Sequence, residues 1–284
     1  MAIHQFIVAE QDDGRRLDEL VRRQLPQLTP QDIRGVFAHR DVKLDGRRSP
    51  PEVRAAAGQL VQVYYMTPSA PLIRVVYRDT DVLLVNKAAG ISVDEGGLIA
   101  LAHRELLRTR PDAPQPIPCH RLDNQTCGLV LFALNTRAAE ILQRAFRERT
   151  MDKRYICLVR GQPKPASAVC GAWLVKDAEV GRVRVLDREI PGSRRIVTAY
   201  ETLAAGSVSR LRVHLITGRT HQIRAHMASL GHPLLGDDIY GDRALNRRLH
   251  VQGKLRLCAQ SLTLETGGAL PQLDGRQFEI DCPF

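Results

Sequence analysis

The sequence has no long apolar run and no paired cysteines. None of its apolar stretches approaches the roughly 20 residues that a membrane-spanning helix needs, so we expect no transmembrane segment. Residues 1–8 lack a basic segment followed by a long apolar core, which argues against a signal peptide. The six cysteines are scattered singly without a C-x-x-C pair, which argues against a zinc cluster and a disulfide framework. We therefore expect a cytoplasmic protein with reduced thiols.

The sequence also lacks the usual patterns of a cofactor or metal site. No glycine-rich loop follows a strand in a way that would hold a nucleoside cofactor, which argues against an RNA methyltransferase. His120, His221 and His226 stand in polar segments, but no carboxylate or cysteine completes a known ligand spacing with them. We expect no cofactor and no metal ion.

Basic residues outnumber acidic ones. The chain has 41 lysine and arginine residues against 31 aspartate and glutamate residues, a formal net charge of +10. Because basic side chains release counterions from a phosphate backbone, this balance favours a polyanionic partner. Many basic proteins bind no nucleic acid, so the net charge alone does not identify the partner, and the sequence motifs carry more weight.

The chain of 284 residues is long enough for a small domain and a large one. Residues 1–66 predict the small one, with a short strand, two helices that each have an apolar face, and further strands at 42–44 and 60–65. Thr29 and Pro30 favour the cap and the first turn of the second helix.

Residues 72–284 predict the large domain, after a proline-rich linker at 67–71. Strands are expected near Val75, Val82, Gly128, Tyr155, Val183, Ile196 and Leu211, and helices over 98–110, 137–149 and 220–230. Because several of these strands follow one another without an intervening helix, the pattern predicts an α+β fold with a mixed, largely antiparallel sheet.

One aspartate stands in the most distinctive segment of the sequence, between His120 and Gly128. The apolar run that follows, from Gly128 to Leu134, predicts a strand buried on both faces. Asp123 would then lie in a loop at the mouth of a rigid element, two residues from Arg121, and functional groups usually lie on such loops. An ordinary turn residue, or a surface carboxylate paired with an arginine, is the alternative.

Other segments of the same polar and apolar character occur in order from about Val75 to the C-terminus. They are Val82–Gly90, Lys153–Tyr155, Thr217–Met227 with Gly231–Asp237, and Leu257–Ala259. In this order the segments closely resemble the RluA-type family of RNA pseudouridine synthases. Two positions depart from the family's pattern, with Ala88 in place of its usual proline and Cys127 in place of its usual serine. Neither departure removes a group that the chemistry needs.

The resemblance implies that the chain isomerises uridine in RNA to pseudouridine, with Asp123 as the catalytic carboxylate. The carboxylate would either attack the sugar carbon or remove the neighbouring proton. Arg224 would be the counterion of Asp123, and Tyr155 would lie against the target base. Arg121 would enter the space that the extruded uridine leaves. The alternatives are an exposed helix residue for Arg224 and an ordinary core tyrosine for Tyr155.

Further residues are expected to bind the substrate or to shape its site. His221 and Gln222 would bind phosphate or orient their loop, and His120 belongs to the same group. Asn86 and Lys87 could touch RNA, although a lysine after a buried strand is more often simply solvated.

Residues 1–66 resemble the RNA-binding domain of ribosomal protein S-four, through R-L-D at 16–18 and V-K-L-D-G at 42–46. The residues that this resemblance implies for RNA binding are Arg15, Arg34, Arg40 and Lys43. Acidic neighbours offset much of their charge, so solvated faces without RNA are the alternative.

The substrate follows less directly from the sequence. Family members that carry such an N-terminal domain mostly look like ribosomal RNA enzymes, so we expect large-subunit ribosomal RNA first and tRNA second. We expect the protein to be a monomer. A non-catalytic RNA-binding or ribosome-assembly factor on the same fold is the alternative from another class.

Overall fold

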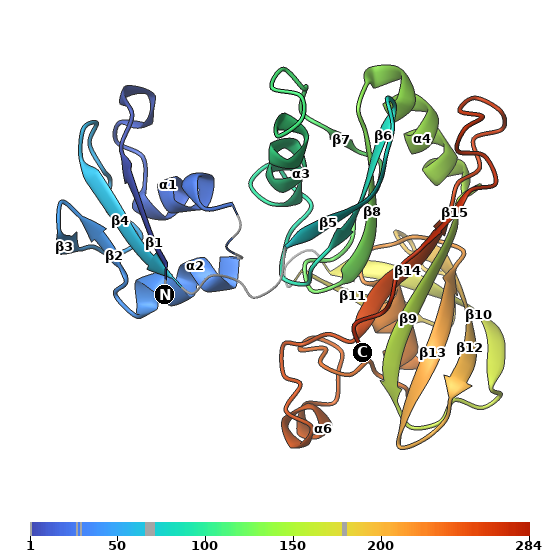
Figure 1. The fold of residues 1–284 in the computed structure, drawn as a ribbon. Coiled ribbons are helices and arrows are strands. Elements are labelled where there is room, and N and C mark those ends of the chain that lie inside the picture. Colours follow the sequence, from blue (N-terminus) through green and yellow to red (C-terminus); the bar gives the residue numbers. More distant parts are fainter. Residues whose placement is uncertain (1, 27, 29, 66–71, 178–180) are drawn as a thin grey trace. The chain divides into compact units, whose positions relative to one another are not determined.

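The computed structural model describes the chain except for residues 1, 27, 29, 66–71 and 178–180 (Figure 1). The chain divides into two compact units, which are residues 1–74 with 90–115 and residues 75–89 with 116–284. The predicted linker at 67–71 and the predicted cap at Thr29 lie outside the described residues. The predicted domain boundaries stay predictions. No helix in the described part of the chain is long and apolar enough to cross a membrane.

The N-terminal part of the first unit is a small sheet with two helices. Its elements are β1 (Ala2–Ile7), the 3-10 helix η1 (Glu10–Asp12), α1 (Leu17–Gln24), α2 (Pro30–Ala38), β2 (Val42–Leu44), β3 (Arg47–Arg48) and β4 (Leu60–Tyr65). The strands pair antiparallel in the order β1-β4-β2-β3. The apolar faces that the sequence predicts for both helices pack into one core, in which Leu17, Val21 and Val63 are fully buried. The same unit contains α3 (Leu98–Leu107).

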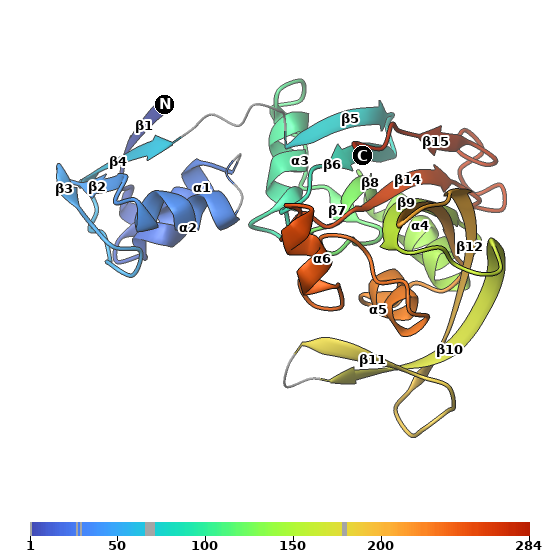
Figure 2. The same cartoon turned by 90° about the horizontal axis from the view of Figure 1, so that it is seen from below.

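The second unit is built on an 11-stranded sheet (Figure 2). Its strands are β5 (Ile73–Arg78), β6 (Val82–Lys87), β7 (Ile117–Pro118), β8 (Cys127–Ala133), β9 (Asp152–Arg160), β10 (Ser167–Asp177), β11 (Arg182–Leu186), β12 (Arg194–Ala204), β13 (Val208–Leu215), β14 (Leu257–Thr263) and β15 (Gln277–Glu279). The main order is β11-β10-β12-β13-β9-β14-β8-β6-β5, with β15 paired to β14 and β7 paired to β8.

The sheet is mixed, as the sequence predicts. β8 and β14 run parallel, whereas the pairs β6–β8, β9–β13, β9–β14 and β10–β12 are antiparallel. The helices of this unit are α4 (Thr136–Glu148), α5 (Gln222–Ser229) and α6 (Arg243–Arg248). The predicted α+β fold is thus confirmed, and the elements that the sequence does not predict include β10, β15 and α6.

β8 lies between β6 and β14 and supports the loop that carries Asp123. Every residue of β8 is buried, as its apolar run predicts for a strand covered on both faces. α4 packs Ala138 and Leu142 into the same core. Asn135 caps α4 because its side chain accepts a hydrogen bond from the N–H of Ala138.

Gly128 allows β8 and β14 to approach each other closely. Its φ is +117°, and a Cβ at this position would lie 2.3 Å from the carbonyl oxygen of Ala259 on β14. Only a residue without a side chain fits this backbone geometry and this spacing. The contact fixes the end of β8 that leads into the loop of Asp123.

Candidate active site

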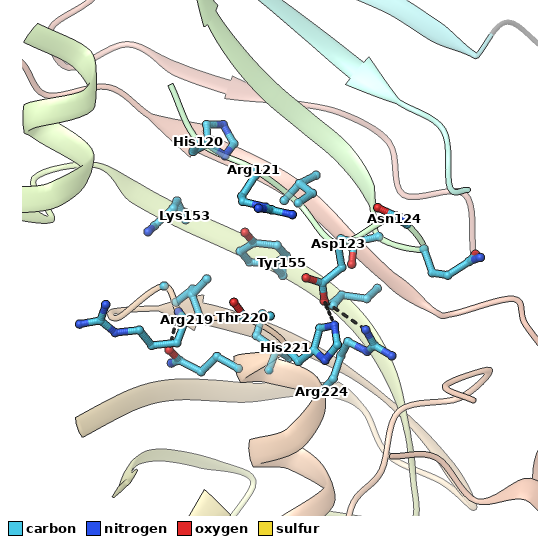
Figure 3. A pocket seen from close by; sticks show the side chains of 18 of the residues that line it. His120, Arg121, Asp123, Asn124, Lys153, Tyr155, Arg219, Thr220, His221 and Arg224 are labelled. Atoms are coloured by element: carbon cyan, nitrogen blue, oxygen red, sulfur yellow. Dashed lines mark hydrogen bonds and ion pairs between the residues drawn. The ribbon is translucent and has the colours of Figure 1, made fainter. Parts of the chain in front are cut away.

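A cavity of about 970 Å³ in the second unit contains most of the predicted site residues in its wall (Figure 3). Its wall is formed by the loop before β8, the end of α4, β9 and the turn that leads into α5. The predicted site residues in this wall are His120, Arg121, Asp123, Tyr155, His221, Gln222 and Arg224. Figure 3 shows Asp123, His221 and Arg224 close together at one end, with Lys153 and Arg219 toward the other.

Asp123 is partly exposed in this cavity, with 24% of its side chain accessible. Its Oδ2 accepts a hydrogen bond from Nη1 of Arg224 at 3.2 Å, and Nε2 of His221 lies 3.9 Å from the same oxygen. Its Oδ1 accepts no hydrogen bond from any described residue. Thr126 closes the loop by donating its backbone N–H to the carbonyl of Asp123. The structure therefore brings together the carboxylate and the cation that the sequence pairs.

Arg224 is buried on α5 and binds two carboxylates. Its Nε donates to Oδ2 of Asp237 at 2.7 Å and its Nη2 to Oδ1 of Asp237 at 2.9 Å, while Nη1 reaches Asp123. Burial acts to lower the pKa of Arg224, but the hydrogen bonds and charges of Asp237 and Asp123 outweigh it and raise that pKa. The guanidinium thus stays charged, and two of its nitrogens are held by a carboxylate other than Asp123.

The sequence does not assign a role to Asp237, which is only 1% exposed. Burial alone would raise its pKa, but hydrogen bonds from Arg224 and from the N–H groups of Tyr240 and Ile239 hold its pKa below the usual value for an aspartate. Asn246 fixes the same turn, because its amide donates to the carbonyl of Asp237. The signal in the sequence is indirect. A buried arginine that pairs with a partly exposed carboxylate is stable only if a second carboxylate also neutralises it, so the sequence implies such a residue without identifying it.

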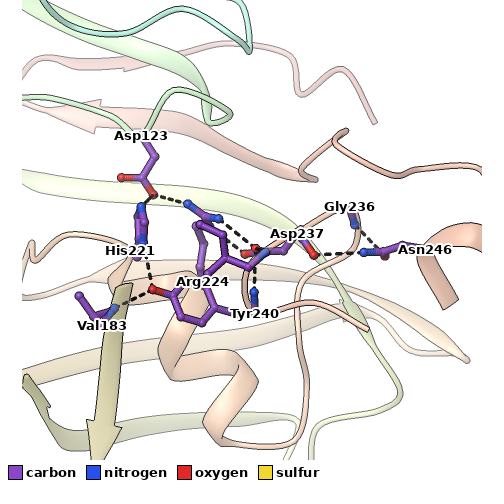
Figure 4. Close-up of polar contacts among 9 residues, drawn as sticks. Asp123, Val183, His221, Arg224, Gly236, Asp237, Tyr240 and Asn246 are labelled. Carbon is purple, nitrogen blue, oxygen red and sulfur yellow. Dashed lines mark hydrogen bonds and ion pairs between the residues drawn. The ribbon is translucent and has the colours of Figure 1, made fainter. Parts of the chain in front are cut away.

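The turn that carries Asp237 also positions His221 (Figure 4). The hydroxyl of Tyr240 lies 3.0 Å from Nδ1 of His221 and accepts a hydrogen bond from the N–H of Val183. His221 itself has a left-handed backbone, with φ of 54°, at the start of α5. Burial lowers its pKa, and so does Arg224, although Asp123 acts the other way. His221 is therefore mainly neutral at neutral pH.

Gln222 orients the turn before α5. Its Nε2 donates to the carbonyl of Val197 and to Oγ1 of Thr198, each at 3.1 Å. Its Oε1 accepts from Oγ1 of Thr217 and from the N–H of Arg219. The residue is only 2% exposed, and both ends of its amide group are bonded to protein atoms. Of the two roles expected for Gln222, these contacts support loop orientation.

The expectation that Lys87 touches RNA or is solvated is wrong. Lys87 is 0% exposed. Its Nζ donates to the carbonyls of Ala88 at 3.0 Å and of Asn124 at 3.1 Å, and burial lowers its pKa to about 8. Lys87 therefore ties the end of β6 to the loop of Asp123. Asn86 precedes it in β6 opposite Leu129, and it is not among the described residues that line the cavity.

His120 lines the cavity as a neutral, packed ring. Its Nε2 accepts a hydrogen bond from the N–H of Leu131 at 3.1 Å, and its ring stacks on Phe146 with 4.5 Å between centroids. Burial, and then the charge of Lys153, lower its pKa to about 3. His120 therefore faces the cavity as an uncharged ring, and its expected part in substrate binding stays a prediction.

Tyr155 and Arg121 both line the cavity, but Tyr155 is nearly buried and Arg121 is exposed. Tyr155 on β9 is 6% exposed, and burial raises its pKa, with a smaller contribution from Asp123. No described residue makes a hydrogen bond to its hydroxyl. Arg121 is exposed and forms no ion pair with a described residue. Tyr155 thus offers a nearly buried aromatic face, and Arg121 a free cation.

The cavity also contains cations that the sequence does not single out. They are Arg147, Arg149, Lys153 and Arg219.

Among the residues that the structure describes, no group of three or more histidine, cysteine, aspartate or glutamate side chains could hold a metal ion.

Solved structures with the same fold define the class of protein. The structure called human RNA pseudouridylate synthase domain containing 4 matches with a TM-score of 0.62 at 24% identity, over 74% of this chain and 88% of that one. Human RNA pseudouridylate synthase domain containing 1 matches with a TM-score of 0.59 at 28% identity, over 77% of this chain and 86% of that one. The fold is that of a pseudouridine synthase.

Sequence comparisons identify the family. Residues 81–229 match the family model described as RNA pseudouridylate synthase. Ribosomal large subunit pseudouridine synthase C of Vibrio parahaemolyticus is 34% identical over 84% of this chain and 81% of its own length. Dual-specificity RNA pseudouridine synthase RluA of Salmonella typhi is 34% identical over 70% of this chain and 90% of its own. The chain belongs to the RNA pseudouridylate synthase family and is an isomerase that acts on RNA.

We expect Asp237→Asn to lower the free energy of unfolding at neutral pH by roughly 3–5 kcal/mol, because it leaves a buried guanidinium short of one anion. The pKa of Asp237 is lower in the folded chain than in the unfolded chain. Its stabilising contribution is therefore complete above about pH 4 and is lost as the pH falls through the folded pKa. The stabilities of parent and variant should approach each other in acid.

Urea unfolding of both proteins across this pH range measures the difference. Asp187→Asn is the matched control, since Asp187 is an exposed aspartate that makes no hydrogen bond or ion pair with a described residue. A stability difference that does not change with pH would contradict the ionic role of Asp237.

Proposed function

We propose that this enzyme forms pseudouridine in large-subunit ribosomal RNA, with Asp123 as its catalytic carboxylate. The observation that carries the proposal is the state of Asp123. It is partly exposed in a cavity with a cationic wall, Arg224 holds one of its oxygens, and no described residue occupies the other. The name of the Vibrio parahaemolyticus relative supports ribosomal RNA as the target.

The reaction needs a carboxylate near the anomeric carbon of the target uridine. The bond from N1 of uracil to this carbon breaks, the base turns, and C5 bonds to the same carbon. N1 gains a proton and C5 loses one, so the reaction needs no oxidant or energy source. Oδ1 of Asp123 is available either to attack the sugar carbon or to remove the neighbouring proton. Arg224 holds Oδ2 and thereby fixes the direction of Oδ1.

We propose that Tyr155 contacts the target base and that Arg121 fills the space that the base leaves in the RNA. An aromatic face tolerates a uracil that turns in its own plane, and Tyr155 presents such a face beside Asp123. Because burial raises its pKa, Tyr155 meets the substrate as a neutral phenol. The guanidinium of Arg121 has no partner among the described residues and the residue is exposed, so the side chain is free to replace the extruded uridine in the RNA.

A tRNA target is the second candidate. It rests on the relative from Salmonella typhi, which is named a dual-specificity enzyme.

We also propose that a single copy of the chain in the cytoplasm is sufficient for activity, because one chain supplies the whole described wall of the cavity. A non-catalytic RNA-binding role on this fold is disfavoured, because Asp123, Tyr155 and Arg224 are all in place.

We propose that residues 1–66 form a module that adds RNA affinity. Arg34 and Arg40 line a cavity of about 780 Å³ in the first unit, together with three further arginines, Arg16, Arg22 and Arg48. Arg15 is a weaker candidate because its charge is paired with Asp12 at 2.9 Å. Lys43 stacks over the ring of Tyr64. The arginines around this cavity are the RNA-binding surface that we favour.

Pseudouridine mapping across total RNA, in cells with and without the protein, tests the target. We expect the signal to disappear at one or more uridines of large-subunit ribosomal RNA. Loss confined to tRNA would move the assignment to the second candidate.

Asp123→Asn should abolish pseudouridine formation while RNA affinity and stability remain close to those of the parent. The amide keeps the shape of the side chain but removes the negative charge and the nucleophilic oxygen. Filter retention and pseudouridine assays on one ribosomal RNA fragment measure the two properties. Asp238→Asn is the control, because Asp238 is an exposed carboxylate in the same cavity wall. Appreciable turnover by Asp123→Asn would refute its catalytic role.

The pair of substitutions Arg34→Gln and Arg40→Gln should weaken RNA binding without changing the rate at saturating RNA. Each lost phosphate contact reduces the slope of log affinity against log salt by about one, so the double variant should lose about two. Arg144→Gln with Arg188→Gln removes the same charge from exposed positions outside both cavity walls. An unchanged slope in the first pair would show that this surface does not bind RNA.

A further inference from the structure

Lys153 points into the same cavity as Tyr155. Both residues lie on β9, and residues two apart on a strand project from the same face of the sheet. Both line the cavity, and their Cα atoms are about 6.6 Å apart along the strand. Arg154 lies between them on the opposite face, where it pairs with Asp152 at 3.1 Å.

Lys153 is half-buried, and its ammonium group forms no ion pair with a described residue. It makes no hydrogen bond with a described residue either, and Nζ lies over the ring of Phe146, 5.8 Å from its centroid. Burial, and then the charge of Arg149, lower its pKa, while the charge of Asp152 opposes them without outweighing them. A desolvated lysine beside another cation is an unfavourable arrangement unless an anion completes it.

The space in front of Lys153 is open to such an anion. A Cβ on residue 218 would lie 3.3 Å from Nζ of Lys153, so Gly218 leaves room there that any other residue would occupy. Arg149 and Arg219 line the same cavity, and both are exposed. Lys153 and Arg219 both lie toward the end of the cavity away from Asp123 (Figure 3). Asp152 is the nearby carboxylate, and it is already bound to Arg154.

We propose that Lys153, with Arg149 and Arg219, forms a binding site for one RNA phosphate next to the target uridine. The inference rests on the proposed function, since it takes the target base to lie on Tyr155. Phosphate is the anion that an RNA substrate supplies, and lysine and arginine bind it through charge-assisted hydrogen bonds. A phosphate held here fixes the extruded nucleotide at two points, its base on Tyr155 and its backbone at Lys153. The site serves substrate binding and not the bond exchange at Asp123.

The test compares three variants on a synthetic ribosomal RNA hairpin centred on a uridine that mapping assigns to this enzyme. Lys153→Gln should raise the half-saturating RNA concentration about tenfold, the loss of one charge-assisted contact, and reduce the salt slope by about one. The rate at saturating RNA should change less than about twofold. Lys153→Arg should restore most of the affinity. Arg154→Gln removes the same charge from the other face of β9 and should change neither quantity.

Hairpins with a neutral methylphosphonate on either side of the target uridine identify the phosphate directly. With the parent enzyme, one of the two hairpins should show the same loss of affinity as Lys153→Gln, and the two changes together should cost no more than either alone. Additive losses for both hairpins, or a fall in the saturating rate with unchanged affinity, would overturn the phosphate site. If the parent forms no pseudouridine in any RNA, the proposed function itself is wrong. If the parent is active and Lys153→Gln binds equally well, only this inference fails.

Discussion

A guanidinium ion removed from water is stable only where anions surround it, and Arg224 meets this condition by sharing itself between two carboxylates. Asp237 accepts hydrogen bonds from two nitrogens of Arg224. Its carboxylate is held in place by the backbone N–H groups of Ile239 and Tyr240 in the same turn. The third nitrogen is thereby directed at Asp123. Because Asp237 supplies most of the neutralising contacts, Asp123 remains partly exposed, and its Oδ1 accepts no hydrogen bond from a described residue. The direction of the Asp123 carboxylate thus depends on Asp237, whose own side chain is fully buried.

Asp123 lies on the loop before β8 and Arg224 on α5 just after a turn, and buried contacts beneath the loop and the turn hold both side chains in position. Lys87 donates to the carbonyl of Asn124 from inside the core, directly beside Asp123. Gly128 lets β8 approach β14 closely and so fixes the end of the same loop. On the opposite wall, Gln222 joins the turn before α5 to β12 through the carbonyl of Val197. Because both walls of the cavity are bonded to the sheet, the carboxylate of Asp123 and the guanidinium of Arg224 keep their relative positions.

The sequence predicts the parts of the structure that local patterns determine. The apolar run of β8 and the helical faces of α1 and α4 have such patterns, whereas β10 alternates between exposed and half-buried residues, with only Leu174 buried, and gives no signal. The proximity of Asp123 and Arg224, which are 101 residues apart, follows from the family resemblance and not from local physics. Lys87 and Asp237 are misjudged or missed for one reason. Whether a charged side chain is buried depends on partners brought from distant segments, and neighbouring residues in the sequence do not reveal them.

The most direct measurement is the rate of pseudouridine formation by Arg224→Lys in a single turnover. Lysine keeps the positive charge of Arg224, but its ammonium group lacks the planar fork that binds Asp237 through two nitrogens and Asp123 through a third. If the geometry of the shared guanidinium directs Asp123, the variant should lose most of its activity, on the order of a hundredfold. A rate equal to that of the parent would show that a positive charge near Asp123 is sufficient and would contradict the central role of the two-carboxylate arrangement.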